Sequence, residues 1–248
     1  MLKYLVVLLA LLNALFAGKV VVAAAANTTY AMEEITAIFK KEYPGTDVDL
    51  ILGSSGKLTA QIKNGAPYDI FLSANMKYPN ALDSGGKSLT RPVVYAKGAL
   101  VLFTVKDLDL SKGIALAADK KVERIAMANY KVAPYGKAAV MALDNAGILN
   151  VAEKKFVNAE SITQTLQFTM TATDIGFVAK SSMYSDKLKG KNVKGKNWID
   201  VDAGLYDPIK QGIILLKHAE GNGDAKKFYD FIFSDKAKAV FEKYGYML

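Results

Sequence analysis

The chain has no cysteine and only one histidine, His218. Without cysteine it can form no disulfide, thiolate metal ligand or cysteine nucleophile, so its stability depends on a hydrophobic core. His218 follows an apolar run and lies in a polar stretch, which predicts a surface position. No set of histidines and carboxylates has the spacing of a metal site, and the G-x-S-x-G pattern of serine hydrolases is absent. These absences argue against an enzyme.

Positively charged residues outnumber negatively charged ones, but only moderately. The chain has 32 Lys and Arg against 24 Asp and Glu, a formal net charge of +8. Much of the excess lies in one run at 187–196 (KLKGKNVKGK), where no aromatic residue separates the lysines. Sites for single-stranded nucleic acid combine cations with aromatic rings. We therefore interpret this run as a solvated loop and expect no nucleic-acid partner.

Long hydrophobic runs are scarce beyond the N-terminus. Residues 1–17 (MLKYLVVLLALLNALFA) combine an early lysine, an apolar stretch and small residues near Ala17. This pattern is typical of a cleavable secretory signal peptide, and it is too short for a membrane span of about 20 apolar residues. We expect cleavage after Ala17 and export of the rest of the chain.

From residue 18 onward, apolar runs that fit buried strands alternate with segments that fit helices. The strands are expected at 19–26, 48–52, 70–72, 124–128 and 175–178, and the helices open at 27–29, 54–55, 134–136 and 159–163. This alternation predicts right-handed βαβ units and parallel sheets. In such sheets ligands bind beyond the carboxyl ends of the strands, where the helices begin. We therefore expect Asn27 and Ser55 to lie at the same edge.

Two further apolar runs predict a division into lobes. Residues 93–103 form one long extended segment with a glycine in the middle, and residues 209–216 form another. If both cross between halves of the molecule, two similar lobes enclose a cleft and move about a hinge. We place the first lobe at 18–97 and 205–248, closed by a helical pair at 225–244, and the second lobe at 98–204.

The stretch from Gly53 to Asn75 (GSSGKLTAQIKNGAPYDIFLSAN) carries the clearest local signal. A Ser-Ser pair precedes a helix that the Gly-Ala-Pro sequence ends, and an apolar strand follows. The first N–H groups of a helix have no internal partner, so the pair can face an anion; the alternative is an ordinary N-cap. The stretch is not a P-loop, because Leu58 stands where the magnesium-binding Ser or Thr would be.

The chain resembles a known family over essentially the whole of residues 18–248. The segments AAAANTTYAMEEI, GSSGKLTAQIKNGAPYDIFLSAN, APYGKAA, AESI and FYDFIFSDKAKAVFEKYGY follow in the order seen in periplasmic molybdate-binding proteins of molybdate ABC transporters. The resemblance implies the α/β, two-lobed periplasmic binding protein fold of type II, with a ligand cleft between lobes joined by two crossing segments. It implies one tetrahedral oxyanion as ligand, molybdate or tungstate, with molybdenum held only in that form.

The resemblance also implies what the chain works with. No catalytic activity and no cofactor are expected. The protein is expected to be a periplasmic monomer that delivers its anion to the membrane permease of an ABC transporter.

Four positions of this sequence match the family's binding residues. The resemblance implies a side-chain donor at Asn27, where the family usually has serine, a hydroxyl donor at Ser55, and backbone N–H donors at Tyr135 and Ile162. Neutral dipoles of this kind can enclose a dianion without burying charged side chains. Size, not charge, would then separate molybdate and tungstate from sulfate.

One position departs from the family pattern. Its usual GIVY sequence is Gly-Phe-Val-Ala here, so Ala179 replaces a tyrosine whose hydroxyl binds the anion. Either Tyr135 or Thr28 supplies the missing bond, or the anion has fewer donors.

Other ligands remain as alternatives on the same fold. A receptor for sulfate or phosphate would use the same kind of site. A ferric-ion receptor would need clustered tyrosinates and carboxylates, which the four positions do not offer.

Overall fold

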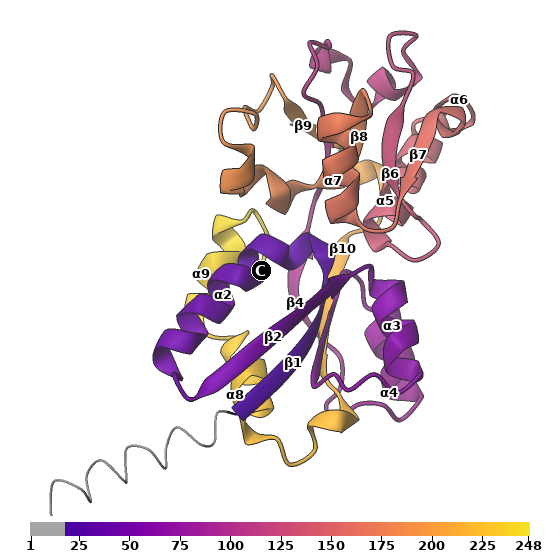
Figure 1. Ribbon diagram of the computed structural model, residues 1–248. Helices are drawn as coiled ribbons and strands as arrows, with labels where there is room; N and C mark the ends of the chain where they lie inside the picture. Colours follow the sequence, from indigo (N-terminus) through magenta and orange to yellow (C-terminus); the bar gives the residue numbers. More distant parts are fainter. Residues whose placement is uncertain (1–17) are drawn as a thin grey trace, which may run out of the picture.

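The computed structural model describes residues 18–248, which form two lobes, each built on a five-stranded sheet with helices packed beside it (Figure 1). The predicted signal peptide, residues 1–17, lies outside the described residues. Among residues 18–248, no helix has the length and apolar character needed to cross a membrane.

The first lobe contains the sheet with strand order β2-β1-β3-β10-β4. Its strands are β1 (Gly18–Ala25), β2 (Thr46–Gly53), β3 (Ile70–Ser73), β4 (Val93–Gly98) and β10 (Ile209–Leu215). Its helices are α2 (Thr29–Glu42), α3 (Ser55–Lys63), α4 (Lys77–Ser84), α8 (Gly223–Phe231) and α9 (Asp235–Lys243). β1 pairs in parallel with β2 and β3, as predicted, whereas β10 is antiparallel to both of its neighbours.

The second lobe contains the sheet with strand order β7-β6-β8-β5-β9. Its strands are β5 (Leu100–Phe103), β6 (Ile125–Ala128), β7 (Phe156–Ala159), β8 (Ile175–Ala179) and β9 (Trp198–Asp200), and its helices are α5 (Pro134–Asn145), α6 (Leu149–Ala152) and α7 (Ile162–Thr171). The short strands β7 and β9 and helix α4 were not predicted. β7 is only partly buried, so its sequence lacks the continuous apolar run by which a buried strand is recognised.

Short 3-10 segments complete the secondary structure. They are η1 (Ala26–Thr28), η2 (Leu110–Ala118), η3 (Glu153–Lys155), η4 (Lys180–Tyr184), η5 (Asp186–Leu188), η6 (Ala203–Leu205) and η7 (Lys217–Ala219).

The core of the first lobe follows from the apolar stripe of α2. Met32, Ile35 and Phe39 recur at helical spacing and are fully buried. The Phe39 ring packs edge-on against Phe228 of α8, with ring centroids 4.9 Å apart. Burying a side chain of this size contributes about 1.5–3 kcal/mol, so the helix is held mainly by packing.

The chain passes between the two sheets twice. The single extended run predicted at 93–103 is wrong in one respect, because it breaks at Ala99 into β4 and β5. The break is needed because β4 pairs with β10 in one sheet and β5 pairs with β8 and β9 in the other. The return passage lies between β9 and β10, so the prediction that the run at 209–216 crosses is wrong: that run forms β10 within the sheet of the first lobe, between β3 and β4. The lobe boundaries at 97/98 and 204/205 stay predictions.

Candidate functional site

A small cavity lies where the two lobes meet, and all four predicted site residues line it. Asn27, Ser55, Tyr135 and Ile162 come from separate segments of both lobes. The rest of the lining is formed by Ala25, Ala26, Gly53, Ser54, Ala74, Ala133 and Pro134. The cavity is small, with a volume of about 10 Å³. None of the lining side chains is charged.

Three helices begin at this cavity. Ser55 is the first residue of α3, Pro134 and Tyr135 open α5, and Ile162 is the first residue of α7. N–H groups in the first turn have no carbonyl of a preceding turn to bind, and the helix dipole places partial positive charge there. The cavity is therefore surrounded by N–H donors from both lobes and attracts negative charge.

The two serines at the start of α3 differ in their surroundings. The Ser55 hydroxyl oxygen accepts the N–H of Ala74 at 3.0 Å, which leaves its own hydrogen free to donate. Ser54 occupies the N-cap position, yet its hydroxyl makes no cap and has no hydrogen-bond partner although the residue is 5% exposed. At α7, by contrast, the Ser161 hydroxyl accepts the N–H of Gln164. The ordinary N-cap alternative thus fails for Ser54.

Ser54 lines the cavity as well, although only Ser55 of the Ser-Ser pair is among the four predicted positions. The sequence signal of Ser54 is the same as that of any N-cap serine. Only the lack of a partner in the folded chain distinguishes it, because a buried hydroxyl left without a hydrogen bond is costly and rare.

Asn27 does not cap a helix, which corrects the prediction for residues 27–29. It lies in η1, and α2 begins at Thr29 without a side-chain cap. The Asn27 Nδ2 donates to Gln211 Oε1 at 3.0 Å and to the Tyr246 hydroxyl at 2.9 Å. Its Oδ1 is buried with no hydrogen-bond partner. The amide is held by long-range contacts, not by its own helix.

The two hydroxyls considered as substitutes for the tyrosine missing at Ala179 differ in whether their hydrogen is already donated. The Thr28 hydroxyl donates to the carbonyl of Ala25 at 2.8 Å. The Tyr135 hydroxyl accepts from Gln211 Nε2 of β10 at 3.3 Å, which leaves its own hydrogen available to donate. Thr28 and Ala179 are also absent from the cavity lining.

Three buried tyrosines surround Gln211 and Asn27. Burial raises the pKa of Tyr95, Tyr135 and Tyr246 well above the ordinary tyrosine value. Their hydroxyls therefore stay neutral at physiological pH and can both donate and accept hydrogen bonds.

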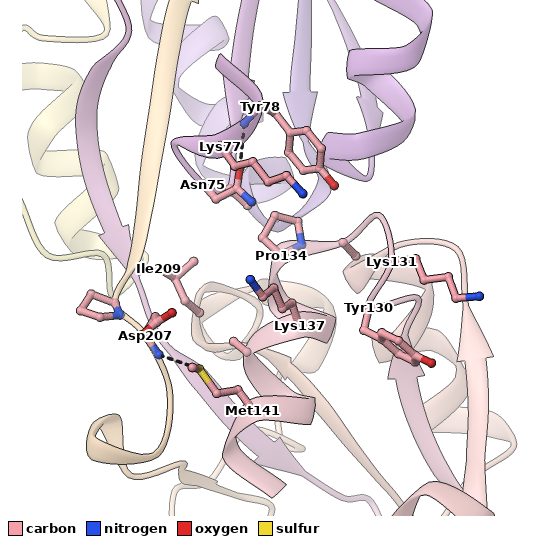
Figure 2. Close-up of a pocket in the computed structure, with 14 residues that line it drawn as sticks. Asn75, Lys77, Tyr78, Tyr130, Lys131, Pro134, Lys137, Met141, Asp207 and Ile209 are labelled. Carbon is pink, nitrogen blue, oxygen red and sulfur yellow. Dashed lines mark hydrogen bonds between the residues drawn. The ribbon is translucent and has the colours of Figure 1, made fainter. Parts of the chain in front are cut away.

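The lysines near the helix starts lie outside the small cavity. Lys57 forms an exposed ion pair with Glu160 of the other lobe at 3.1 Å. Lys137 lines a larger cavity of about 340 Å³, the outer chamber, together with Lys77 and Lys131 (Figure 2). The outer chamber shares Ala74, Ala133 and Pro134 with the small cavity. It therefore forms a cationic approach, while the inner lining stays neutral.

Direct hydrogen bonds hold the lobes together beside the cavity. The Gly56 N–H donates to the carbonyl of Val132 at 2.9 Å, and the Thr163 hydroxyl donates to the carbonyl of Ala26 at 2.9 Å. Both bonds join a residue of the first lobe to one of the second. These two bonds can form only when the lobes are in contact.

Two predictions about other chemistry are tested by the structure. His218 is exposed, as predicted, and its Nδ1 lies 3.0 Å from the buried carboxylate of Asp69. Among residues 18–248, no group of three or more His, Asp or Glu side chains is placed to hold a metal ion.

Comparisons with known proteins agree with this geometry. Residues 20–247 match the family described as Bacterial extracellular solute-binding protein. The chain is 36% identical to the molybdate-binding protein ModA of Azotobacter vinelandii over 94% of this chain and 91% of that protein. It is 37% identical to ModA of Rhodobacter capsulatus over 93% of this chain and 89% of that protein.

A solved structure shows the same architecture. The periplasmic molybdate-binding protein of Azotobacter vinelandii superposes with a TM-score of 0.84 at 32% identity, covering 92% of this chain and 99% of that one. The predicted two-lobed periplasmic binding protein fold is thereby confirmed. The chain belongs to the bacterial extracellular solute-binding proteins, in the family that includes these molybdate-binding relatives.

Proposed function

We propose that this protein captures molybdate, and also tungstate, and delivers the anion to the membrane permease of an ABC transporter. One observation carries the proposal: three helix N-termini converge on a small, uncharged cavity between the lobes in which the buried Ser54 hydroxyl has no partner. A tetrahedral oxyanion supplies the acceptors that this arrangement lacks. The molybdate-binding relatives support this choice of anion.

The donors of the site are neutral. Hydrogen bonds from N–H and O–H groups to an ionised oxygen are shorter and about twice as strong as bonds between neutral groups. We assign the donors to the hydroxyls of Ser54 and Ser55, the N–H groups of Tyr135 and Ile162, and the side chain of Asn27. Molybdenum is bound only as its oxyanion. Ser54 takes the place left open by Ala179.

A neutral site also favours selectivity by size. A lysine beside the anion would attract sulfate and phosphate as strongly as molybdate. A rigid set of dipoles instead fits anions of one radius, and sulfate is smaller than molybdate or tungstate. The lining contains no carboxylate and only one tyrosine, which does not suit a ferric ion.

The cellular role follows from the ligand. The protein acts as a periplasmic monomer, exported by the signal peptide predicted at residues 1–17, and it is not an enzyme. Closure around the anion would give the permease a shape that distinguishes the loaded from the empty protein.

Calorimetric titration of residues 18–248 with molybdate, tungstate, sulfate and phosphate tests the proposal. We expect one site per chain that binds molybdate and tungstate much more tightly than sulfate or phosphate. Equal or tighter binding of sulfate or phosphate would identify a receptor for that anion. Failure to bind any of the four would remove the oxyanion function.

A further inference from the structure

Gln211 lies next to the cavity without lining it and is the centre of a buried polar network. It is fully buried on β10, at a register shift where that strand pairs with β4. Such irregularities redirect side chains and are frequent near functional sites. The Gln211 Oε1 accepts from Asn27 Nδ2, and its Nε2 donates to the Tyr135 hydroxyl of the other lobe. The Tyr95 hydroxyl lies 3.5 Å from Oε1.

The Asn27 amide has the wrong polarity for an anion in this arrangement. Its nitrogen is engaged by Gln211 and Tyr246, so its oxygen is the amide atom left without a partner. Asn27 lines the cavity, and a carbonyl oxygen turned toward an oxyanion repels it. The same residue is nevertheless placed where a donor is needed.

The oxygen and nitrogen of a carboxamide are nearly equal in size, so a half-turn exchanges acceptor and donor in the same space. If Asn27 turned alone, its Oδ1 would meet Gln211 Oε1 at the distance of a hydrogen bond with no hydrogen between them. If both amides turn, Gln211 Nε2 donates to Asn27 Oδ1 and Gln211 Oε1 accepts from the Tyr135 hydroxyl. Asn27 Nδ2 then points to the cavity as a donor.

The surrounding tyrosines permit either state. The Tyr246 hydroxyl donates to the Asn27 carbonyl at 2.8 Å and accepts from Asn27 Nδ2. After the turn it can still donate, to either oxygen of Asn27. The Tyr95 hydroxyl can accept from Gln211 Nε2 in place of donating to Oε1. Both oxygens of the two amides then have a partner, and the Asn27 Nδ2 is left to donate to the anion.

We propose that Gln211 is a positioning residue that turns together with Asn27 when an oxyanion enters, so that Asn27 changes from acceptor to donor. This inference rests on the proposed oxyanion function. In the observed network, Asn27 Nδ2 donates to Gln211 and Tyr246. With an anion, Gln211 supplies the donor that keeps Asn27 Oδ1 satisfied. Because Gln211 also contacts Tyr135 of the second lobe, the turn would connect the anion to a contact between the two lobes.

Neutron diffraction from crystals of the deuterated protein, grown with and without molybdate, tests the turn directly. We expect the Asn27 Nδ2 deuterons to point toward Gln211 and Tyr246 in the empty protein. In the complex, one of them should point to the anion, and Gln211 Nε2 should donate to Asn27 Oδ1. The same amide orientations in both crystals would overturn the proposal.

A double-mutant cycle of Asn27→Ala and Gln211→Met tests the coupling in solution. Methionine keeps the length of glutamine without its amide. We expect Gln211→Met to weaken molybdate binding about tenfold in the chain with Asn27 and less than twofold in the Asn27→Ala chain, the non-additivity of directly interacting residues. Equal losses in both backgrounds would mean that Gln211 acts only through structure, and would overturn the proposal.

The outcome for the unsubstituted protein separates this inference from the proposed function. If that protein binds neither molybdate nor tungstate, the proposed function fails and the inference fails with it. If it binds them with additive losses in the cycle or unchanged amide orientations, the inference alone fails.

Discussion

Ser54 and Ser55 are neighbours with identical side chains, but the fold gives their hydroxyls different partners. Ser55 is held by the N–H of Ala74, whereas Ser54 has no partner in the closed protein. The Ser54 hydroxyl therefore adds no hydrogen bond to the protein until a ligand accepts from it. Comparing the two serines therefore distinguishes what a hydroxyl contributes to ligand binding from what it contributes to folding.

We predict that Ser54→Ala weakens molybdate binding by about 1.5–3 kcal/mol, the usual worth of a hydrogen bond to a charged group. The free energy of unfolding without the anion should change by less than about 0.5 kcal/mol, because no protein partner is lost. Titration calorimetry and denaturant unfolding of the same variant measure the two quantities.

Ser161→Ala is the matched control. This serine does cap its helix, α7, so its loss should lower the free energy of unfolding by about 1 kcal/mol. If Ser54→Ala left the affinity unchanged, Ser54 would no longer count as a donor to the anion.

Helix α3 joins the first lobe to the second at its second residue. A Cβ at Gly56 would lie 2.7 Å from the Tyr78 hydroxyl and 2.9 Å from both the Cβ and the carbonyl oxygen of Val132. The Gly56 N–H donates to that same carbonyl. A glycine is therefore required here by the close approach of the second lobe.

We predict that Gly56→Ala disturbs closure without disturbing folding. Alanine favours a helix over glycine by about 1 kcal/mol, so the anion-free protein should be no less stable. The affinity for molybdate should fall, and small-angle scattering should show less compaction at saturation. Gly223→Ala is the control, because Gly223 also opens a helix and has open space around its Cβ position. Full compaction of the Gly56→Ala protein would contradict the prediction.

Asp174 joins the edge of β8 to the segment that leads into β6. Burial by itself would raise the pKa of its carboxyl, but hydrogen bonds from Lys106 and from the backbone N–H groups of Arg124 and Glu123 outweigh burial and lower it. The two backbone bonds measure 2.8 and 2.7 Å. A carboxylate with a lowered pKa binds its proton less tightly in the folded than in the unfolded chain.

The sign of the pH dependence follows. The stabilisation by Asp174 is fully present above the unfolded value of about 3.9 and is lost as the pH falls through the folded pKa. We predict that Asp174→Asn lowers the free energy of unfolding at pH 7 by about 1 kcal/mol, the difference between charged and neutral hydrogen bonds. It should also flatten the decline in stability below about pH 4. If denaturant unfolding showed the same decline in stability at acid pH with and without the substitution, Asp174 would contribute little.

In the molecule as a whole, the charged side chains near the cleft lie apart from the uncharged lining of the small cavity. The lysines of the outer chamber and the Lys57–Glu160 pair surround the approach, while the inner lining is neutral. Such an arrangement can draw an anion toward the cleft by long-range attraction, which salt screens, and then hold it by dipoles, which salt affects much less.

We predict that the Lys57→Gln, Lys137→Gln double variant keeps its affinity for molybdate within about 1 kcal/mol, the scale of exposed-charge effects. Titrations at low and high ionic strength provide the measurement, and the Ser55→Ala variant provides the contrast, with an expected loss of about 1–3 kcal/mol. A loss of several kcal/mol in the lysine variant would make the lysines ligands and would contradict binding by dipoles.

The positions of most helices and strands could be predicted from the sequence because their signals are local, although α4 and α6 were not. Proline at 134, the serines at 54–55 and the glycine at 65 mark where helices begin or end, and apolar periodicity marks the buried faces. Alternating strands and helices bring helix starts to one edge of a sheet within each lobe, but the meeting of α3 with α5 and α7 depends on how the two lobes face each other. The resemblance then indicated four residues that the fold places together.

The partners of individual side chains were decided only by the tertiary structure. Asn27 reads as a helix cap in sequence but bonds to Gln211 and Tyr246, 184 and 219 residues away along the chain. Ser54 is likewise distinguished only in the folded chain, where its hydroxyl has no hydrogen-bond partner. The run at 93–103 breaks at Ala99 because its two halves pair in different sheets. A sequence pattern reports what a segment does with its neighbours; which distant group meets a side chain depends on how the two lobes close.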